Sequence, residues 1–159
     1  MPRTASPIRS ALLAALLALA WAGPAVAAQA GTASHTSTSG VAWVSAATDA
    51  DIERSFAQAR AENKPLLLYW GAKWCPPCNQ LKATLFNRAD FIERSRSVVA
   101  VNIDGDMPGA QQLGARFQVR GYPTMILMGA NGSEITRLPG EVDAPQVLAV
   151  LQLGLAGGR

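Results

Sequence analysis

The chain has 159 residues, with 14 basic and 11 acidic side chains and a formal net charge of +3. Two of the basic residues, Arg3 and Arg9, lie near the N-terminus, so the rest of the chain is close to neutral. It lacks a stripe of basic residues interleaved with aromatic ones, which argues against nucleic-acid binding. The length suits one domain with a single hydrophobic core, and we expect a monomer.

Residues 1–30 have the layout of a secretory signal peptide. The basic start is followed by an uncharged apolar stretch over residues 11–22 and then by small residues. Cleavage is expected after Ala27 or Ala30, each of which ends an A-x-A triplet. A retained membrane anchor is the alternative, although the apolar stretch is shorter than the roughly 20 residues that span a bilayer. The sequence therefore predicts an exported protein.

The next segment, residues 31–45, is small and polar and is predicted to be a flexible linker before a domain over residues 46–159. His35, the only histidine, lies in this segment and is expected to be a solvated linker residue.

The first half of the domain alternates apolar and amphipathic stretches. A short strand is predicted over residues 41–44, and a helix is predicted to begin at Thr48 or Asp49 and to end near Asn63. Ile52, Phe56 and Ala59 share one face of this helix. Residues 66–70 are continuously apolar, as expected of a central strand that is covered on both faces.

The second half supplies further helices and strands. The helix after the cysteines is expected to break near Asn87 and to resume over residues 89–93. Asn131-Gly132 is a strong hairpin signal. The last helix is predicted to start at Asp143, with Leu148, Leu151 and Leu155 along one side. The other predicted elements are strands at 98–103, 125–128 and 134–138, a loop at 104–108 and a short helix at 111–117. This order indicates an α/β fold with a mixed central sheet flanked by helices.

The only two cysteines, Cys75 and Cys78, follow the apolar strand in a short turn, predicted to be exposed, at the start of a helix. A helix N-terminus favours an anion, and the thiolate is the reactive form of cysteine. Cys75 is therefore the candidate nucleophile, and Cys78, further into the helix, is the candidate resolving thiol. Pro76 and Pro77 suit the first helical turn but remove two N–H donors, so we expect weaker stabilisation of the Cys75 thiolate than with glycine at position 76.

Other uses of the cysteine pair fit less well. A structural disulfide closing so short a loop would restrain the unfolded chain little. A zinc site needs four ligands, and covalent haem attachment needs a histidine where Asn79 stands. We therefore expect no cofactor and no bound metal. A copper(I) carrier remains an alternative, since two thiolates are soft ligands.

These residues resemble the thioredoxin superfamily. The resemblance rests on Trp74-Cys75-Pro76-Pro77-Cys78 after a buried strand and on Gly121-Tyr122-Pro123-Thr124 further along, and it extends over residues 49–155. Within the superfamily the chain looks most like the C-terminal domain of bacterial thiol:disulfide interchange proteins, and residues 72–75, 84–86 and 102–104 carry that likeness together with Phe91.

The resemblance implies a thioredoxin fold and a substrate-binding site around the cysteines. It implies that Pro123 is cis and lies against the pair, and that the backbone of Tyr122 pairs with a bound substrate chain. Trp74 is expected to shield the sulfurs and to offer an apolar contact; the alternative is an ordinary core aromatic.

The chain departs from the family at Tyr69. Thioredoxins usually have a buried aspartate six residues before the first cysteine, and a lysine that often faces it is replaced here by Ala100. We expect solvent or the Tyr69 hydroxyl to substitute in handling the proton of Cys78, or resolution to be slower.

The sequence thus predicts an exported, periplasmic thiol-disulfide oxidoreductase with a redox-active Cys75–Cys78 pair. The resemblance favours the reducing direction, with disulfide-bearing proteins as substrates and a membrane thiol-disulfide protein as electron donor. A dithiol oxidase or isomerase is the alternative.

Overall fold

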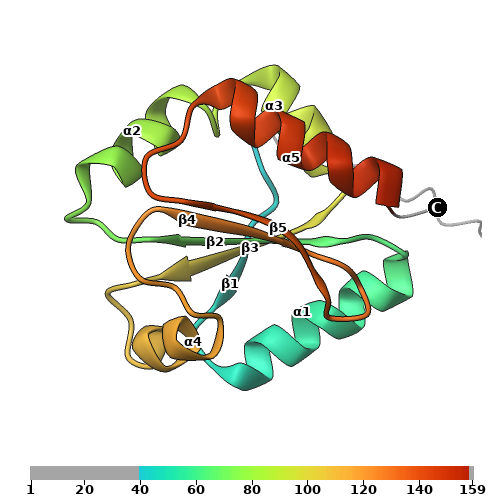
Figure 1. Ribbon diagram of the computed structural model, residues 1–159, viewed down its shortest axis with the longest axis horizontal. Coiled ribbons are helices and arrows are strands. Elements are labelled where there is room, and N and C mark those ends of the chain that lie inside the picture. The colour runs from blue at the N-terminus through green and yellow to red at the C-terminus, as the bar shows by residue number, and fades with distance from the viewer. Residues whose placement is uncertain (1–39, 158–159) are drawn as a thin grey trace, which may run out of the picture. The chain divides into compact units, whose positions relative to one another are not determined.

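A five-stranded mixed sheet lies between two layers of helices in the computed structural model, which describes residues 40–157 (Figure 1). The strand order is β1-β3-β2-β4-β5, and α1 and α4 cover one face while α2, α3 and α5 cover the other. The predicted fold class is therefore confirmed. The strands are β1 Val44–Ala46, β2 Leu66–Gly71, β3 Val99–Asp104, β4 Thr124–Met128 and β5 Glu134–Pro139, and the helices are α1 Asp49–Glu62, α2 Pro76–Thr84, α3 Ala89–Ser95, α4 Ala110–Arg116 and α5 Ala144–Gly157.

Strand β2 is the centre of the sheet, and all six of its residues are buried. It runs parallel to β3 and antiparallel to β4. Because side chains alternate along a strand, Leu68 and Trp70 enter the core beneath α1 and α4, whereas Leu67 and Tyr69 enter the core beneath α2, α3 and α5. The unbroken apolar run is thus explained by burial on both faces, as the sequence predicts.

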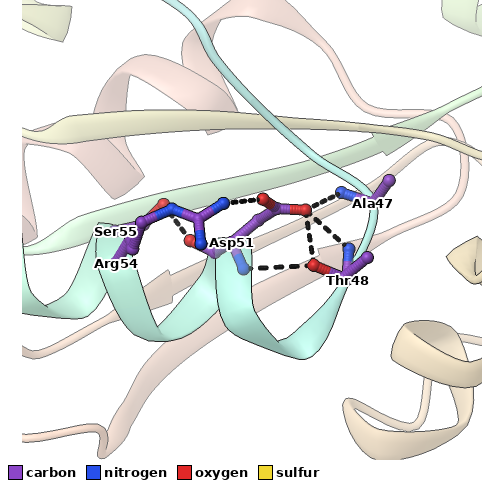
Figure 2. A network of polar contacts seen from close by, with 5 residues as sticks. All are labelled: Ala47, Thr48, Asp51, Arg54 and Ser55. Atoms are coloured by element: carbon purple, nitrogen blue, oxygen red, sulfur yellow. Dashed lines mark hydrogen bonds and ion pairs between the residues drawn. The ribbon is translucent and has the colours of Figure 1, made fainter.

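The start of α1 is fixed by a capping box (Figure 2). Thr48 Oγ1 accepts the backbone N–H of Asp51 at 3.3 Å, and Asp51 Oδ2 accepts the N–H of Thr48 at 2.8 Å and that of Ala47 at 3.0 Å. The hydrogen bonds that the Asp51 carboxylate accepts from the Ala47 N–H, the Thr48 hydroxyl and the Thr48 N–H lower its pKa to about 2. The predicted start at Thr48 or Asp49 is confirmed, because these bonds satisfy N–H groups that a helix start leaves unpaired.

Helix α5 begins at the predicted place but buries a different stripe. Asp143 Oδ1 accepts the N–H of Gln146 at 2.9 Å, which caps the helix. The buried positions of this helix are Val147, Val150, Leu151 and Gly154. Of the three leucines predicted along one side, Leu151 is buried, Leu148 is half-buried and Leu155 is 41% exposed, so that side is only partly buried. The stripe at positions i, i+3, i+4 and i+7 starts one residue earlier than expected.

The N-terminal strand lies further along the chain than predicted. Residues 41–43 are not in a strand, and β1 pairs with β3 from Val44 to Ala46. The ring of Trp43 packs against those of Tyr69 and Phe86, at centroid distances of 5.8 and 5.1 Å. Trp43, Val44 and Ser45, which the sequence predicts to be the end of the linker, are therefore part of the folded domain.

The signal peptide expected at residues 1–30, its cleavage sites at Ala27 and Ala30, and His35 lie outside the described residues. Within residues 40–157, no helix has the length and apolar character needed to cross a membrane.

Candidate active site

The two cysteines stand at the N-terminus of α2 and are joined by a disulfide. Cys75 is the N-cap residue, and its Sγ accepts the backbone N–H of Cys78 at 3.3 Å. Pro76 and Pro77 occupy the first two helical positions, as predicted. Neither proline has an N–H to donate. The Cys75 sulfur therefore receives its hydrogen bond from the first turn of α2 through the N–H of Cys78.

Both cysteines are more buried than the sequence suggests. Lys73, Trp74 and Pro76 are exposed, but Cys75 is only 2% exposed and Cys78 is fully buried. The expectation of an exposed turn therefore holds for the residues around Cys75 and is wrong for Cys75 itself. The difference arises because Tyr122, distant in sequence, packs against the cluster that the cysteines form with Ala72.

Trp74 is the most exposed large hydrophobic side chain of the described part of the chain, at 70%. It is therefore not a core aromatic. Its ring lies 6.0 Å from that of Tyr122, so the two rings form an aromatic surface beside the disulfide. The side chain that packs against the cysteines is Tyr122, whereas Trp74 offers its surface to solvent.

The peptide bond between Tyr122 and Pro123 is cis, as the resemblance implies. The Pro123 carbonyl accepts the N–H of Gly140 at 2.8 Å, and the Thr124 hydroxyl donates to the carbonyl of Gly121 at 2.7 Å. These two contacts fix the turn on both sides of the cis bond. The turn brings Tyr122 to the cysteines, which lie more than forty residues away in sequence.

Two carboxylates, Asp104 at the end of β3 and Asp106 in the loop that follows, lie close to Lys73 and Tyr122. Asp106 Oδ2 accepts the N–H of Lys73 at 3.1 Å, and Asp104 Oδ1 accepts the N–H of Asp106 at 3.1 Å. Burial raises the pKa of Tyr122, and the negative charges of Asp106 and then Asp104 raise it further. The sequence predicts only a loop over residues 104–108, with no role at the site. The position of this loop after a parallel strand is the sequence signal that it lies near the cysteines, because the loops after parallel strands gather at one edge of the sheet.

The side chain of Tyr69 lies in the core between the sheet and helices α2, α3 and α5. The residue is 1% exposed, and among residues 40–157 its hydroxyl has no hydrogen-bond partner. Burial raises the pKa of Tyr69 to about 12. The hydroxyl is therefore neutral at physiological pH and can donate a hydrogen bond, but it cannot act as a general base as a carboxylate would.

Within residues 40–157, no three His, Cys, Asp or Glu side chains gather where they could hold an ion.

Comparison with known proteins identifies the fold and the family. A sequence profile of the thioredoxin-like domain matches residues 52–154. The chain belongs to the thioredoxin-like family. The thioredoxin fold of this domain also agrees with that of a thioredoxin from Thermus thermophilus, which has 22% sequence identity, a TM-score of 0.61 and coverage of 73% of this chain and 88% of that one. A putative disulphide-isomerase from Bacteroides thetaiotaomicron is 27% identical, with a TM-score of 0.58 over 74% of this chain and 94% of that protein.

Curated relatives of this thioredoxin-like chain are much longer than it is. The thiol:disulfide interchange protein DsbD 2 of Pseudomonas aeruginosa is 33% identical over 121 residues, which cover 74% of this chain and 21% of the relative. The thiol:disulfide interchange protein DsbD of Pseudomonas fluorescens is 31% identical over 107 residues, which cover 65% of this chain and 18% of the relative. The chain thus spans about a fifth of the length of these relatives, and the resemblance predicted from its motifs is confirmed for this part.

Proposed function

We propose that this thioredoxin-like chain is a thiol-disulfide oxidoreductase that exchanges disulfides with other polypeptides through Cys75 and Cys78. The observation that carries the proposal is the disulfide at the N-terminus of α2, packed against the residue before a cis-proline and flanked by an exposed tryptophan. The likeness to thiol:disulfide interchange proteins supports it.

The proposed cycle begins with the reduced pair. The Cys75 thiolate attacks one sulfur of a substrate disulfide, and the other substrate sulfur leaves as a thiolate. Cys78, once deprotonated, then attacks Cys75 Sγ in the mixed disulfide, which releases the second substrate thiolate. Two electrons have passed to the substrate, and Cys75 and Cys78 are left oxidised. A donor dithiol must then reduce the pair.

Three surrounding residues have proposed roles in binding. An extended substrate segment would pair with the backbone of Tyr122 beside Pro123, as an added strand does at a sheet edge. Trp74 would cover apolar side chains of that segment, since its exposed ring lies next to Cys75. These contacts would hold the substrate sulfur near Cys75 without a deep pocket.

We further propose that the reaction runs in the reducing direction, in the bacterial periplasm, with a membrane thiol-disulfide protein as electron donor. The resemblance to interchange proteins supports the direction, and the signal-like residues 1–30 support export. The alternative, a dithiol oxidase or isomerase, would use the same residues but keep the cysteine pair at a more oxidising redox potential. A measured potential therefore distinguishes the reductase from this alternative.

Two experiments test this proposal. The Cys78→Ala variant should accumulate mixed disulfides with its substrates on Cys75, which non-reducing gels of the periplasmic fraction would reveal, whereas Cys75→Ala should trap none. Equilibration of the purified protein with glutathione should give a potential nearer the −270 mV end than the −120 mV end of the range of about −270 to −120 mV found for such motifs. An absence of trapped partners would contradict the activity, and a potential near the oxidising end would reverse the direction.

A further inference from the structure

A hollow of about 530 Å³ lies directly beside the cysteine pair, between α2 and the segment that leads into α5. Pro77, which stands between the two cysteines, forms part of its wall. The hollow is therefore close enough to the disulfide to receive part of any polypeptide that reacts there. The other lining residues that set its polarity and charge are Leu81, Leu85, Glu141, Val142 and Asp143.

The hollow combines an apolar floor with acidic charge. Leu81 and Leu85 are almost completely buried, and Val142 is half-buried. Among the residues that the structure describes, Glu141 and Asp143 are the ionisable side chains that line it, and both are acidic. Asp143 is engaged in capping α5. Glu141 is exposed, and among residues 40–157 its carboxylate makes no hydrogen bond or ion pair, so it remains available to a ligand.

A second hollow, on the face of α1 and α4, differs in charge. It measures about 460 Å³ and is lined by Arg60, Arg116 and Arg137 together with two glutamates. Glu53 pairs with Arg116 at 2.8 Å, and Glu134 pairs with Arg137 at 2.5 Å. Of these two hollows, the one beside the disulfide is therefore the one that holds a glutamate without an ion pair.

We propose that this hollow receives a lysine or arginine side chain of the substrate polypeptide, two or three residues from the reacting cysteine. This inference rests on the proposed function. Lysine and arginine have a long apolar stem that can lie against the half-buried Pro77 and Val142 while the charged end reaches Glu141. The substrate class is thus a polypeptide disulfide with a neighbouring basic residue.

The spacing follows from chain geometry. An extended substrate advances about 3.3 Å per residue, so two or three residues span about 7–10 Å. Along α2 the rise is about 1.5 Å per residue, which places Leu81 and Leu85 about 6 and 12 Å beyond Pro77. In the proposed docking the substrate segment runs from Cys75 along α2, so that a side chain two or three residues from its sulfur lies over the hollow.

The expected preference is modest, because Glu141 is solvent-exposed. An exposed ion pair changes an equilibrium or a rate by about two- to five-fold, and salt screens it. The hollow would accordingly select among substrates, while the cysteines determine whether exchange occurs.

The test uses the purified, reduced protein and short peptides joined to glutathione by a disulfide. The peptides carry lysine, norleucine or glutamate two or three residues from the cysteine, and the rate of peptide-thiol release is measured. We expect the lysine peptide to react about two- to five-fold faster than norleucine, and glutamate to be slowest. The difference should shrink in 0.5 M salt.

Three variants make the test specific. Glu141→Gln should abolish the lysine preference, and Glu141→Lys should reverse it in favour of glutamate. Glu53→Gln, the same change on the opposite face of the sheet, should leave it intact. If the norleucine peptide reacts but charge makes no difference, or if Glu141→Gln keeps the preference, the docking site is wrong while the exchange activity stands. If no peptide reacts, the proposed function itself fails, and this inference with it.

Discussion

Gly105 lies against the ring of Tyr122 so closely that an added Cβ would stand 2.6 Å from Tyr122 Cζ and 2.7 Å from its hydroxyl oxygen. Tyr122 in turn packs against the cysteine cluster. A glycine in the loop after β3 thus sets the position of the side chain that covers the disulfide.

Replacing Gly105 by alanine should therefore displace Tyr122. We expect a loss of about 1–3 kcal/mol in the free energy of unfolding, as for other overpacked sites, together with slower disulfide exchange. Denaturant unfolding and an insulin-reduction assay would measure the two effects. Gly40→Ala is the control, since an added Cβ there has no neighbour within 4 Å. Wild-type stability and rate in Gly105→Ala would show that Tyr122 does not depend on this contact.

Removal of the Tyr69 hydroxyl should stabilise the oxidised protein. The buried hydroxyl has no partner among residues 40–157, and an unpaired buried polar group costs about 1–3 kcal/mol. Tyr69→Phe should accordingly raise the free energy of unfolding of the disulfide form by about 1 kcal/mol. A loss of stability would mean that the hydroxyl makes a favourable contact.

The same variant tests how Cys78 loses its proton. If the hydroxyl assists, turnover of Tyr69→Phe should fall; unchanged turnover would remove Tyr69 from the residues that act on Cys78. Because burial raises the pKa of Tyr69 to about 12, wild-type and variant pH–rate profiles should have the same shape below pH 10.

Glycine at position 76 should make the Cys75 thiol more reactive. Pro76 and Pro77 take the first two positions of α2 and supply no N–H, so the Cys75 sulfur receives the donor of Cys78 alone from this turn. Pro76→Gly would add an N–H near the sulfur and favour the thiolate. We expect faster alkylation of the reduced variant by iodoacetamide at pH 6 than of the wild type. An equal or slower rate would contradict this account, and Pro145→Gly, a proline near the start of α5, serves as the control.

The capping box of α1 should make stability depend on acid pH. The pKa of Asp51 is lowered from 3.8 to about 2 in the folded protein, so its ionised form stabilises the fold above the unfolded-state value and this contribution is lost as the pH falls through 2. Asp51→Asn should melt at a lower temperature than the wild type at pH 6, with the difference disappearing towards pH 2. Thermal unfolding between pH 2 and 6 measures this.

The conservative change Asp49→Asn provides the comparison at the same helix start. Asp49 contacts the Arg116 guanidinium and takes no part in the capping box. A difference between wild type and Asp51→Asn that stayed constant down to pH 2 would exclude the carboxylate charge as its cause.

The sequence by itself determined the elements and their order, because local signals define them. The continuous apolar run of β2, the caps at Thr48 and Asp143, and the Asn131-Gly132 turn each act over a few residues. The two motifs around Cys75 and Pro123 indicated the family for the same reason, since each is a contiguous stretch of sequence.

Only the tertiary structure decided which side chains cover the cysteines and which surround them. Tyr122 buries Cys75, and Asp106 binds the N–H of Lys73, because the loops after β3 and before β4 meet α2 at one edge of the sheet. Glu141 and Pro77, which are far apart in sequence, line the same hollow for the same reason. Contacts between segments far apart in the chain depend on strand order and register, and no local pattern of residues specifies those distances.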